Sequence, residues 1–247
     1  MKDPRLALET ALKAMDLMGY NALGLGEEEL RWGEAVLAGV AKEVSFPFLC
    51  ANLPSRKGTW RPYAVLETAE GPRVALVAVV SPQLLPRGLR QRARDPAGVL
   101  EELVPRLRQE ADLVVLLSHL GRKATLELLR QVPGVDMAVV AHGGLLRPRR
   151  VGEAVVAGAG FRGQYVGLVD LELGAKGVSS FSGRLVMLSE EFGDDPRVLQ
   201  LVKAYKDAVT EGRRAEDPRE RARRMVREMT PEEFIRYLRE RQRGGLR

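Results

Sequence analysis

Two histidines and a run of three glutamates are the residues of this sequence that could support chemistry. His119 and His142 are the only histidines among the 247 residues, and each is followed by a glycine within two positions, in SHLG and AHGG. Glu27 opens the glutamate run in ALGLGEEEL. Two imidazoles and one carboxylate suffice to hold Zn²⁺, Mn²⁺ or Fe²⁺ with coordination positions left open. The three residues are therefore candidate ligands of one divalent metal ion, and the sequence indicates no other cofactor.

Each candidate ligand lies where a predicted strand ends. The continuous apolar runs in ADLVVLLSHLG and VDMAVVAHGG are typical of strands covered on both faces, and NALGLG predicts a short strand before Glu27. Ligands of open α/β sheets gather beyond the carboxyl ends of strands, so the three side chains are expected to lie near one another. A structural interpretation stays open for each residue. A histidine at a strand end can simply be hydrogen-bonded, and acids at a helix start complement the helix dipole.

The remaining pattern alternates helices and strands and then becomes a succession of strands. This switch predicts an α/β fold with a mixed sheet or two stacked sheets. The predicted helices cover residues 4–19, 27–44, 96–109 and 122–132, and the second should turn Leu30, Ala35, Val36 and Val40 inward. The other predicted strands lie within residues 46–53, 61–69, 73–80, 153–160, 163–173 and 183–189.

The composition changes from about Asp194 onward. Asp195-Pro196 and Asp217-Pro218 each predict a helix start, and Thr230-Pro-Glu-Glu233 matches a capping box. We therefore expect one domain over residues 1–190 and a helical extension over residues 191–247 that is rich in arginine and glutamate.

Bulk composition predicts a soluble globular protein. Hydrophobic residues make up 45% and charged residues 29% of the chain. No apolar run is long enough for a membrane span, and the first residues lack a signal-peptide pattern, so a cytoplasmic location without a membrane partner is expected. The net charge of +6 invites a nucleic-acid interpretation, but aromatic residues are only 5%, which favours solvated helix faces instead. Cys50 is the only cysteine and is expected in the core.

Six blocks in order resemble the calcineurin-like metallophosphoesterases, in the 5'-nucleotidase (UshA-like) branch. AMDLMGYNALGLGEEELRWG resembles the block that carries the family's Asn-His-Glu motif, FPFLCANL its FPVLSANL, ADLVVLLSHLG its SHLG block and GVDMAVVAHGG its Gly-His-x-His block. The other two blocks are RPYAVLETAEGPRVALVAVVSP and VVAGAGFRGQYVGLVDLEL. The resemblance implies two mixed sheets packed face to face with helices outside, an αββα sandwich. It also implies a two-metal site at the strand ends that hydrolyses phosphate esters, often those of nucleotides.

The resemblance is eroded at the residues that do chemistry. Glu27 stands in place of the asparagine metal ligand, and Glu28 stands in place of the catalytic histidine, a role that a carboxylate does not fill at neutral pH. His119 and His142 occupy two ligand positions, whereas Gly144 replaces the second histidine of the Gly-His-x-His block. The family's Asp-x-His strand and second aspartate would precede the first residue of this chain. No catalytic residue is therefore assigned, and the ligands that remain are those of one metal.

Several functions follow from this pattern. The favoured one is a degenerate homologue, non-catalytic or weakly active, that holds one metal ion; the alternative is a decaying site without metal. A second hypothesis is an active phosphoesterase that acts on nucleotides and is completed by an N-terminal segment or a partner subunit. The strand edges left by the missing strands have three competing explanations: a misassigned gene start, a fragment, or strands supplied by a second copy or a partner chain. Phe161 or Arg162 could contact a phosphate-ester substrate, and the arginine-rich helices give nucleic-acid binding as a third, less favoured hypothesis.

Overall fold

The computed structural model describes residues 4–68, 71–160, 162–174 and 177–215, together with Thr230 and Glu233. The chain divides into two compact units. The larger unit is Leu12–Asp195, and the other comprises Met1–Ala11 and Pro196–Arg247. Helix α1 (Pro4–Leu17) crosses the boundary between them. The predicted domain division at residue 190 stays a prediction.

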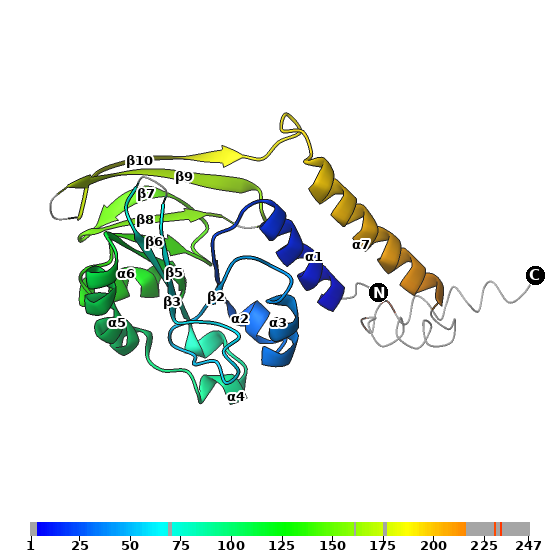
Figure 1. Ribbon diagram of the computed structural model, residues 1–247, viewed down its shortest axis with the longest axis horizontal. Helices are drawn as coiled ribbons and strands as arrows, with labels where there is room; N and C mark the ends of the chain where they lie inside the picture. Colours follow the sequence, from blue (N-terminus) through cyan, green and yellow to red (C-terminus); the bar gives the residue numbers. More distant parts are fainter. Residues whose placement is uncertain are drawn as a thin grey trace, which may run out of the picture. The chain divides into compact units, whose positions relative to one another are not determined.

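A six-stranded mixed sheet forms the centre of the larger unit, in the order β3-β4-β5-β6-β8-β7 (Figure 1). The central pairings β4–β5, β5–β6 and β6–β8 are parallel, whereas β3 and β7 are antiparallel edge strands. Because the parallel strands run in the same direction, their carboxyl ends all lie at the same end of the sheet. The bounds are β3 (Tyr63–Leu66), β4 (Val74–Val80), β5 (Leu113–His119), β6 (Met137–Val140), β7 (Leu145–Val151) and β8 (Ala154–Ala159).

Two helices, α5 (Pro96–Glu110) and α6 (Arg122–Gln131), cover one face of this sheet (Figure 1). The core between them and the sheet is aliphatic, with Leu107 and Leu116 fully buried. Helix α5 begins as the sequence predicted, because the Asp95 carboxylate accepts a hydrogen bond of 2.9 Å from the Gly98 N–H. The predicted strands β4 and β5 and helices α5 and α6 are confirmed.

A strand pair, β9 (Tyr165–Gly174) and β10 (Gly177–Met187), packs on the opposite face of the sheet (Figure 1). Val169, Leu171 and Phe181 of this pair contact a small core that includes Leu113 and Val155 of the sheet. Helices therefore lie on one face of the sheet and a second layer of strands on the other. This arrangement confirms the predicted α/β class with a mixed sheet.

The segment that carries Glu27 is built from short elements. Strand β1 (Leu23–Gly24) pairs in parallel with β2 (Phe48–Leu49), so both predicted strands are present but only two residues long. Helix α2 (Glu27–Leu30) follows β1 directly. Beyond β4 the chain forms two further short helices, η1 (Pro82–Leu84) and α4 (Arg87–Arg90).

The prediction of one continuous helix over residues 27–44 is wrong. Helix α2 ends at Leu30, and α3 (Glu34–Val40) begins after Gly33, which has a φ of +78° and breaks the helix. The break changes the helix phase, so Ala35 is exposed and Leu37 is fully buried in its place. Of the other predicted inward residues, Leu30 and Val40 are buried and Val36 is half-buried.

The smaller unit contains helix α7 (Pro196–Ala215), which begins at the predicted Asp195-Pro196 start. The predicted start at Asp217-Pro218 lies outside the described residues. The predicted capping box is present: the Thr230 N–H donates to Glu233 Oε2 at 2.8 Å, and the Glu233 N–H donates to Thr230 Oγ1 at 3.3 Å. Among the helices that the structure describes, none has the length and apolar character needed to cross a membrane.

Candidate metal centre

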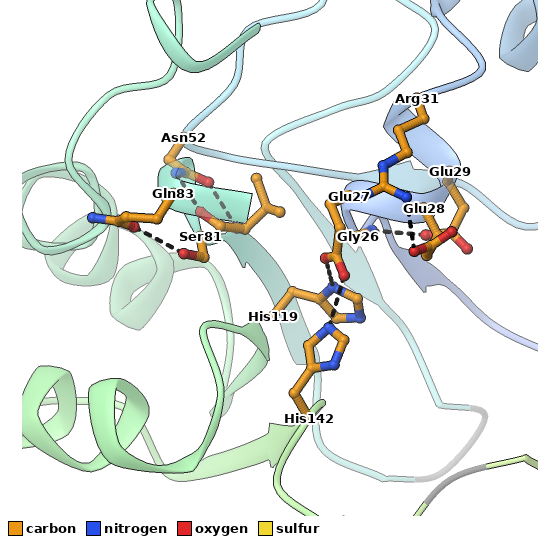
Figure 2. Close-up of polar contacts among 11 residues, drawn as sticks. Gly26, Glu27, Glu28, Glu29, Arg31, Asn52, Ser81, Gln83, His119 and His142 are labelled. Carbon is orange, nitrogen blue, oxygen red and sulfur yellow. Dashed lines mark hydrogen bonds and ion pairs between the residues drawn. The ribbon is translucent and has the colours of Figure 1, made fainter. Parts of the chain in front are cut away.

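Three side chains from separate strand ends converge on one point (Figure 2). The Glu27 carboxylate lies against both imidazoles, with Oε2 at 3.1 Å from His119 Nδ1 and Oε1 at 3.0 Å from His142 Nε2. The two imidazole rings are 4.8 Å apart between centroids, at an interplanar angle of 64°. The structure thus brings together all three residues that the sequence singled out as candidate ligands.

The geometry of these atoms fits a divalent metal ion. One donor atom from each residue lies within 4.8 Å of the other two. An ion with ligand bonds of about 2.1 Å separates tetrahedral ligand atoms by about 3.4 Å, which lies within this limit. The two imidazoles contact different oxygens of Glu27, so the side chains would have to turn from their mutual contacts toward a shared ion. A carboxylate with two imidazoles is a donor set that zinc, manganese and ferrous iron accept. The three residues are therefore a candidate ligand set for one ion.

The charge of Glu27 suits this role. Its side chain is only 7% exposed, and burial by itself raises the pKa of the carboxyl. A hydrogen bond from its own backbone and the nearby His119 and His142 act in the opposite direction and bring the pKa below its ordinary value. Glu27 is consequently ionised at neutral pH and presents a buried negative charge to a cation.

The three consecutive glutamates have three different environments (Figure 2). Only Glu27 contacts the histidines. Glu28 has a side chain that is 69% exposed and pairs with Arg31 at 3.2 Å, while Glu29 Oε2 accepts a 2.9 Å hydrogen bond from the Gly26 N–H. Glu28, at the position of the family's catalytic histidine, therefore makes a surface ion pair, and Glu29 caps the start of α2.

Gly26 is a site residue that the sequence interpretation missed. A Cβ placed on Gly26 would lie 1.9 Å from Cε1 and 2.2 Å from Nδ1 of His119. The backbone of Gly26 is extended, with φ of −100°, so the glycine is needed for space and not for its conformational freedom. The only available signal was its position before Glu27 at a strand end, and that position does not indicate which side chain approaches it.

Buried hydrogen bonds fix the strand ends that carry the site. The Ser118 and Thr125 hydroxyls lie 2.7 Å apart, and the Thr125 hydroxyl donates to the Gly121 carbonyl, which anchors the loop after His119. At the end of β4, the fully buried Asn52 donates to the Val80 carbonyl and accepts from the Val80 N–H, both at 2.9 Å. Asn52 thus joins the segment after β2 to the end of β4, 28 positions further along the chain.

His142 adopts a φ of +55°, an uncommon conformation for a residue other than glycine, and its side chain is 46% exposed.

The remaining candidate residues lie outside this site. Arg162 is exposed in the turn between β8 and β9 and makes no hydrogen bond or ion pair with the three residues in the described part of the chain. Phe161 lies outside the described residues. Cys50 is 2% exposed, so it is a core residue as predicted, and burial raises the pKa of its thiol to about 12.

Comparison with known proteins gives a consistent set of relatives. No protein-family model matches the chain. The 5'-nucleotidase of Bos taurus is 26% identical over 217 residues, which cover 74% of this chain and 38% of that protein. The structure of a 5'-nucleotidase precursor from Thermus thermophilus superposes with a TM-score of 0.72 at 25% identity, over 82% of this chain and 46% of that one. The calcineurin-like phosphoesterase YfkN from Bacillus subtilis gives a TM-score of 0.69 at 20% identity, over 87% and 78% of the two chains.

The mixed sheet, the strand-end site and these likenesses define a protein with the metallophosphoesterase fold. The chain is similar in sequence and in structure to 5'-nucleotidases, which agrees with the resemblance that the six sequence blocks carry. The regions matched in the two 5'-nucleotidase relatives from Bos taurus and Diplobatis ommata amount to 38% and 39% of their lengths.

Proposed function

We propose that the chain is a degenerate relative of the 5'-nucleotidases that holds one divalent metal ion at Glu27, His119 and His142 and hydrolyses phosphate esters weakly or not at all. The convergence of these three side chains around an ionised, buried carboxylate is the observation that carries the proposal. A divalent ion bound there supplies Lewis-acid chemistry toward a phosphoryl oxygen. The residues of the chain bind and orient that ion.

The weak or absent turnover follows from two residues beside this site. Glu28 faces solvent and pairs with Arg31, so it does not offer a proton to the leaving group of an ester. Gly144 provides no imidazole at the position where the resemblance expects a second histidine. A phosphate ester at this site would therefore lie beside the metal ligands but would lack the groups that complete hydrolysis. Arg162, in the exposed turn after β8, remains a candidate contact for such an ester.

Metal content of the purified chain tests the first half of the proposal. Elemental analysis should find about one equivalent of a divalent metal, and calorimetric titration of the metal-free chain with Mn²⁺ or Zn²⁺ should give one site. His119→Ala and His142→Ala should each lower the affinity at least about tenfold, because each removes one of three ligands. Glu28→Gln is the matched control and should bind as the wild type does. Failure of both metals to bind would reject the metal centre.

An active phosphoesterase is the second candidate function. It is favoured by the likeness to the 5'-nucleotidase of Bos taurus and by the presence of both histidines in one site. Assays with AMP and with bis(p-nitrophenyl) phosphate, in Mn²⁺ or Zn²⁺, separate the two functions. We expect rates near background. Metal-dependent turnover that disappears in His119→Ala and persists in Glu28→Gln would instead establish the active enzyme.

A further inference from the structure

A cavity of about 520 Å³ lies apart from the candidate metal centre. Glu27 follows the carboxyl end of β1, whereas Phe46, Pro47 and Phe48 border the cavity at the amino end of β2, which runs parallel to β1. The metal centre and the cavity therefore lie at opposite ends of this strand pair. The cavity is bounded on its other sides by the carboxyl end of α3 and by the loop over residues 57–61. We call it the basic cavity.

The charged residues that line the basic cavity are all cationic. They are Lys42, Lys57 and Arg61, and no carboxylate is among the lining residues. All three side chains are exposed, and within the described part of the chain none of them forms an ion pair. Three unpaired cations around one concave surface produce a positive potential that favours an anion.

Two carboxylates hold parts of the cavity wall in place. Glu34 accepts hydrogen bonds from the Arg56 N–H at 3.1 Å and the Lys57 N–H at 2.7 Å, and these bonds fix the loop that carries Lys57. Asp16 accepts from both the hydroxyl and the N–H of Ser45, at 2.6 and 2.7 Å. Glu43, next to Lys42 in the sequence, forms its ion pair with Lys13.

The rest of the lining is mostly apolar. Its apolar members are Ala38, Ala41, Val44, Phe46, Pro47 and Phe48, and Ser45, Gly58 and Thr59 complete it. The Thr59 hydroxyl oxygen is closed off from solvent and has no hydrogen-bond partner among the described residues, so it does not face the cavity. The volume lies within the range of small-molecule sites, about 300–1,000 Å³.

We propose that the basic cavity binds a small organic phosphate, whose anionic group contacts Lys42, Lys57 and Arg61 and whose apolar body lies against the aliphatic and aromatic lining. Phosphate is the anion that this set suits, because the arginine fork matches its oxygens in pairs and lysines add charge. The site is separate from the metal centre and does not depend on the function proposed for it.

Calorimetric titration with phenylphosphonate tests this proposal. The probe combines an anionic phosphorus group with an apolar ring and has no ester bond to hydrolyse. The titration is made on the full chain in EDTA, with wild type and His119→Ala side by side. We expect saturable binding at one site that is the same in both proteins and weakens as NaCl is added.

Charge-removing variants locate the bound probe. Lys57→Ala and Arg61→Gln should each weaken binding about fivefold to tenfold, because each removes one charged contact. Lys123→Ala is the matched control, since Lys123 is an exposed lysine on α6 away from the basic cavity, and it should bind as wild type does.

Three results would overturn the proposal. The first is no saturable binding of phenylphosphonate by wild type at millimolar concentration. The second is binding that Lys57→Ala and Arg61→Gln leave unchanged. The third is binding that disappears in His119→Ala, which would place the anion at the metal centre. None of these results bears on whether Glu27 and the histidines hold a metal, because metal binding is measured separately.

Discussion

At the scale of single residues, the proposed metal centre depends on the lack of a side chain at Gly26. Gly26 leaves the space that the His119 imidazole occupies beside Glu27. A methyl group there would overlap the ring, while the extended backbone would accept alanine without strain. A substitution at Gly26 therefore changes the geometry of the site with less effect on the stability of the fold than a substitution of Glu27, His119 or His142.

Gly26→Ala should displace His119 and lower metal affinity at least about tenfold, since changes at residues that hold a metal ligand in position typically cost one to two orders of magnitude. Calorimetric titration with Zn²⁺ measures the effect, and a thermal melt shows whether the fold persists. Gly39→Ala is the control, because Gly39 lies in helix α3 with open space around it. Equal metal affinity in both variants would mean that His119 is not a ligand.

Cys50 gives a second prediction at this scale. Its thiol is buried and has a pKa of about 12, whereas the thiolate is the reactive form. At pH 8 the native chain should react with iodoacetamide about a thousandfold more slowly than the chain in guanidinium chloride, where the pKa returns to about 8.5. Mass spectrometry of timed samples measures both rates. Rapid labelling of the folded chain would show that Cys50 is accessible.

The same thiol sets a pH dependence. Its pKa is higher in the folded chain than in the unfolded chain, so the folded state holds this proton more tightly. The resulting stability is complete below about pH 8.5 and declines as pH rises from there toward 12. Urea unfolding of wild type and Cys50→Ala at pH 8 and pH 10.5 should show a steeper loss of stability in wild type. An equal loss of stability in wild type and Cys50→Ala would contradict a raised pKa of Cys50 in the folded chain.

At the scale of elements, Gly33 decides how the segment after Glu27 is folded. The apolar spacing over residues 27–44 predicts one helix, but Gly33 has φ of +78° and ψ of +157° and divides it into α2 and α3. This conformation belongs almost entirely to glycine. The break allows α2 to end after one turn beside the site while α3 buries Leu37 and Val40 in its own direction.

Gly33→Ala should consequently destabilise the protein by about 1–3 kcal/mol, the usual cost of forcing a side chain into this region of backbone space. Chemical denaturation measures the difference. No atom lies within 4 Å of the added Cβ, so the loss would come from the backbone and not from a clash. Unchanged or increased stability would indicate that residues 27–44 do form the continuous helix that the sequence pattern favours.

The elements also show what sequence can and cannot predict. Strand β5 and helix α5 were predictable because each combines a long apolar pattern with clear end signals, such as Asp95. Strand β7 was missed because Leu-Leu-Arg-Pro-Arg-Arg-Val contains a proline and three arginines, which an edge strand tolerates and a central strand does not. The convergence of Glu27, His119 and His142 was predictable from residue type and strand-end position. Gly26 and the Ser118–Thr125 pair were not, because their roles arise from contacts between distant segments.

At the scale of the whole molecule, the order of the strands brings the three residues of the proposed metal centre together. Glu27 and His119 are 92 positions apart in the sequence, and His142 lies on a third strand end. All three belong to the unit Leu12–Asp195, and an unfolded chain does not hold them together. Metal binding is therefore linked to folding of this unit, since an ion that binds only the folded form shifts the equilibrium toward it.

Zinc or manganese should accordingly raise the stability of the chain by about 2.7 kcal/mol when the free ion is at one hundred times its dissociation constant. For a unit of this size the melting temperature should rise by about 5–10 °C, and EDTA should reverse the rise. Differential scanning calorimetry of wild type and His142→Ala makes the comparison. Because His142 is partly exposed, its replacement should spare the metal-free fold and remove most of the rise. If wild type and His142→Ala show the same rise, the ion binds elsewhere and the three converging side chains only form hydrogen bonds.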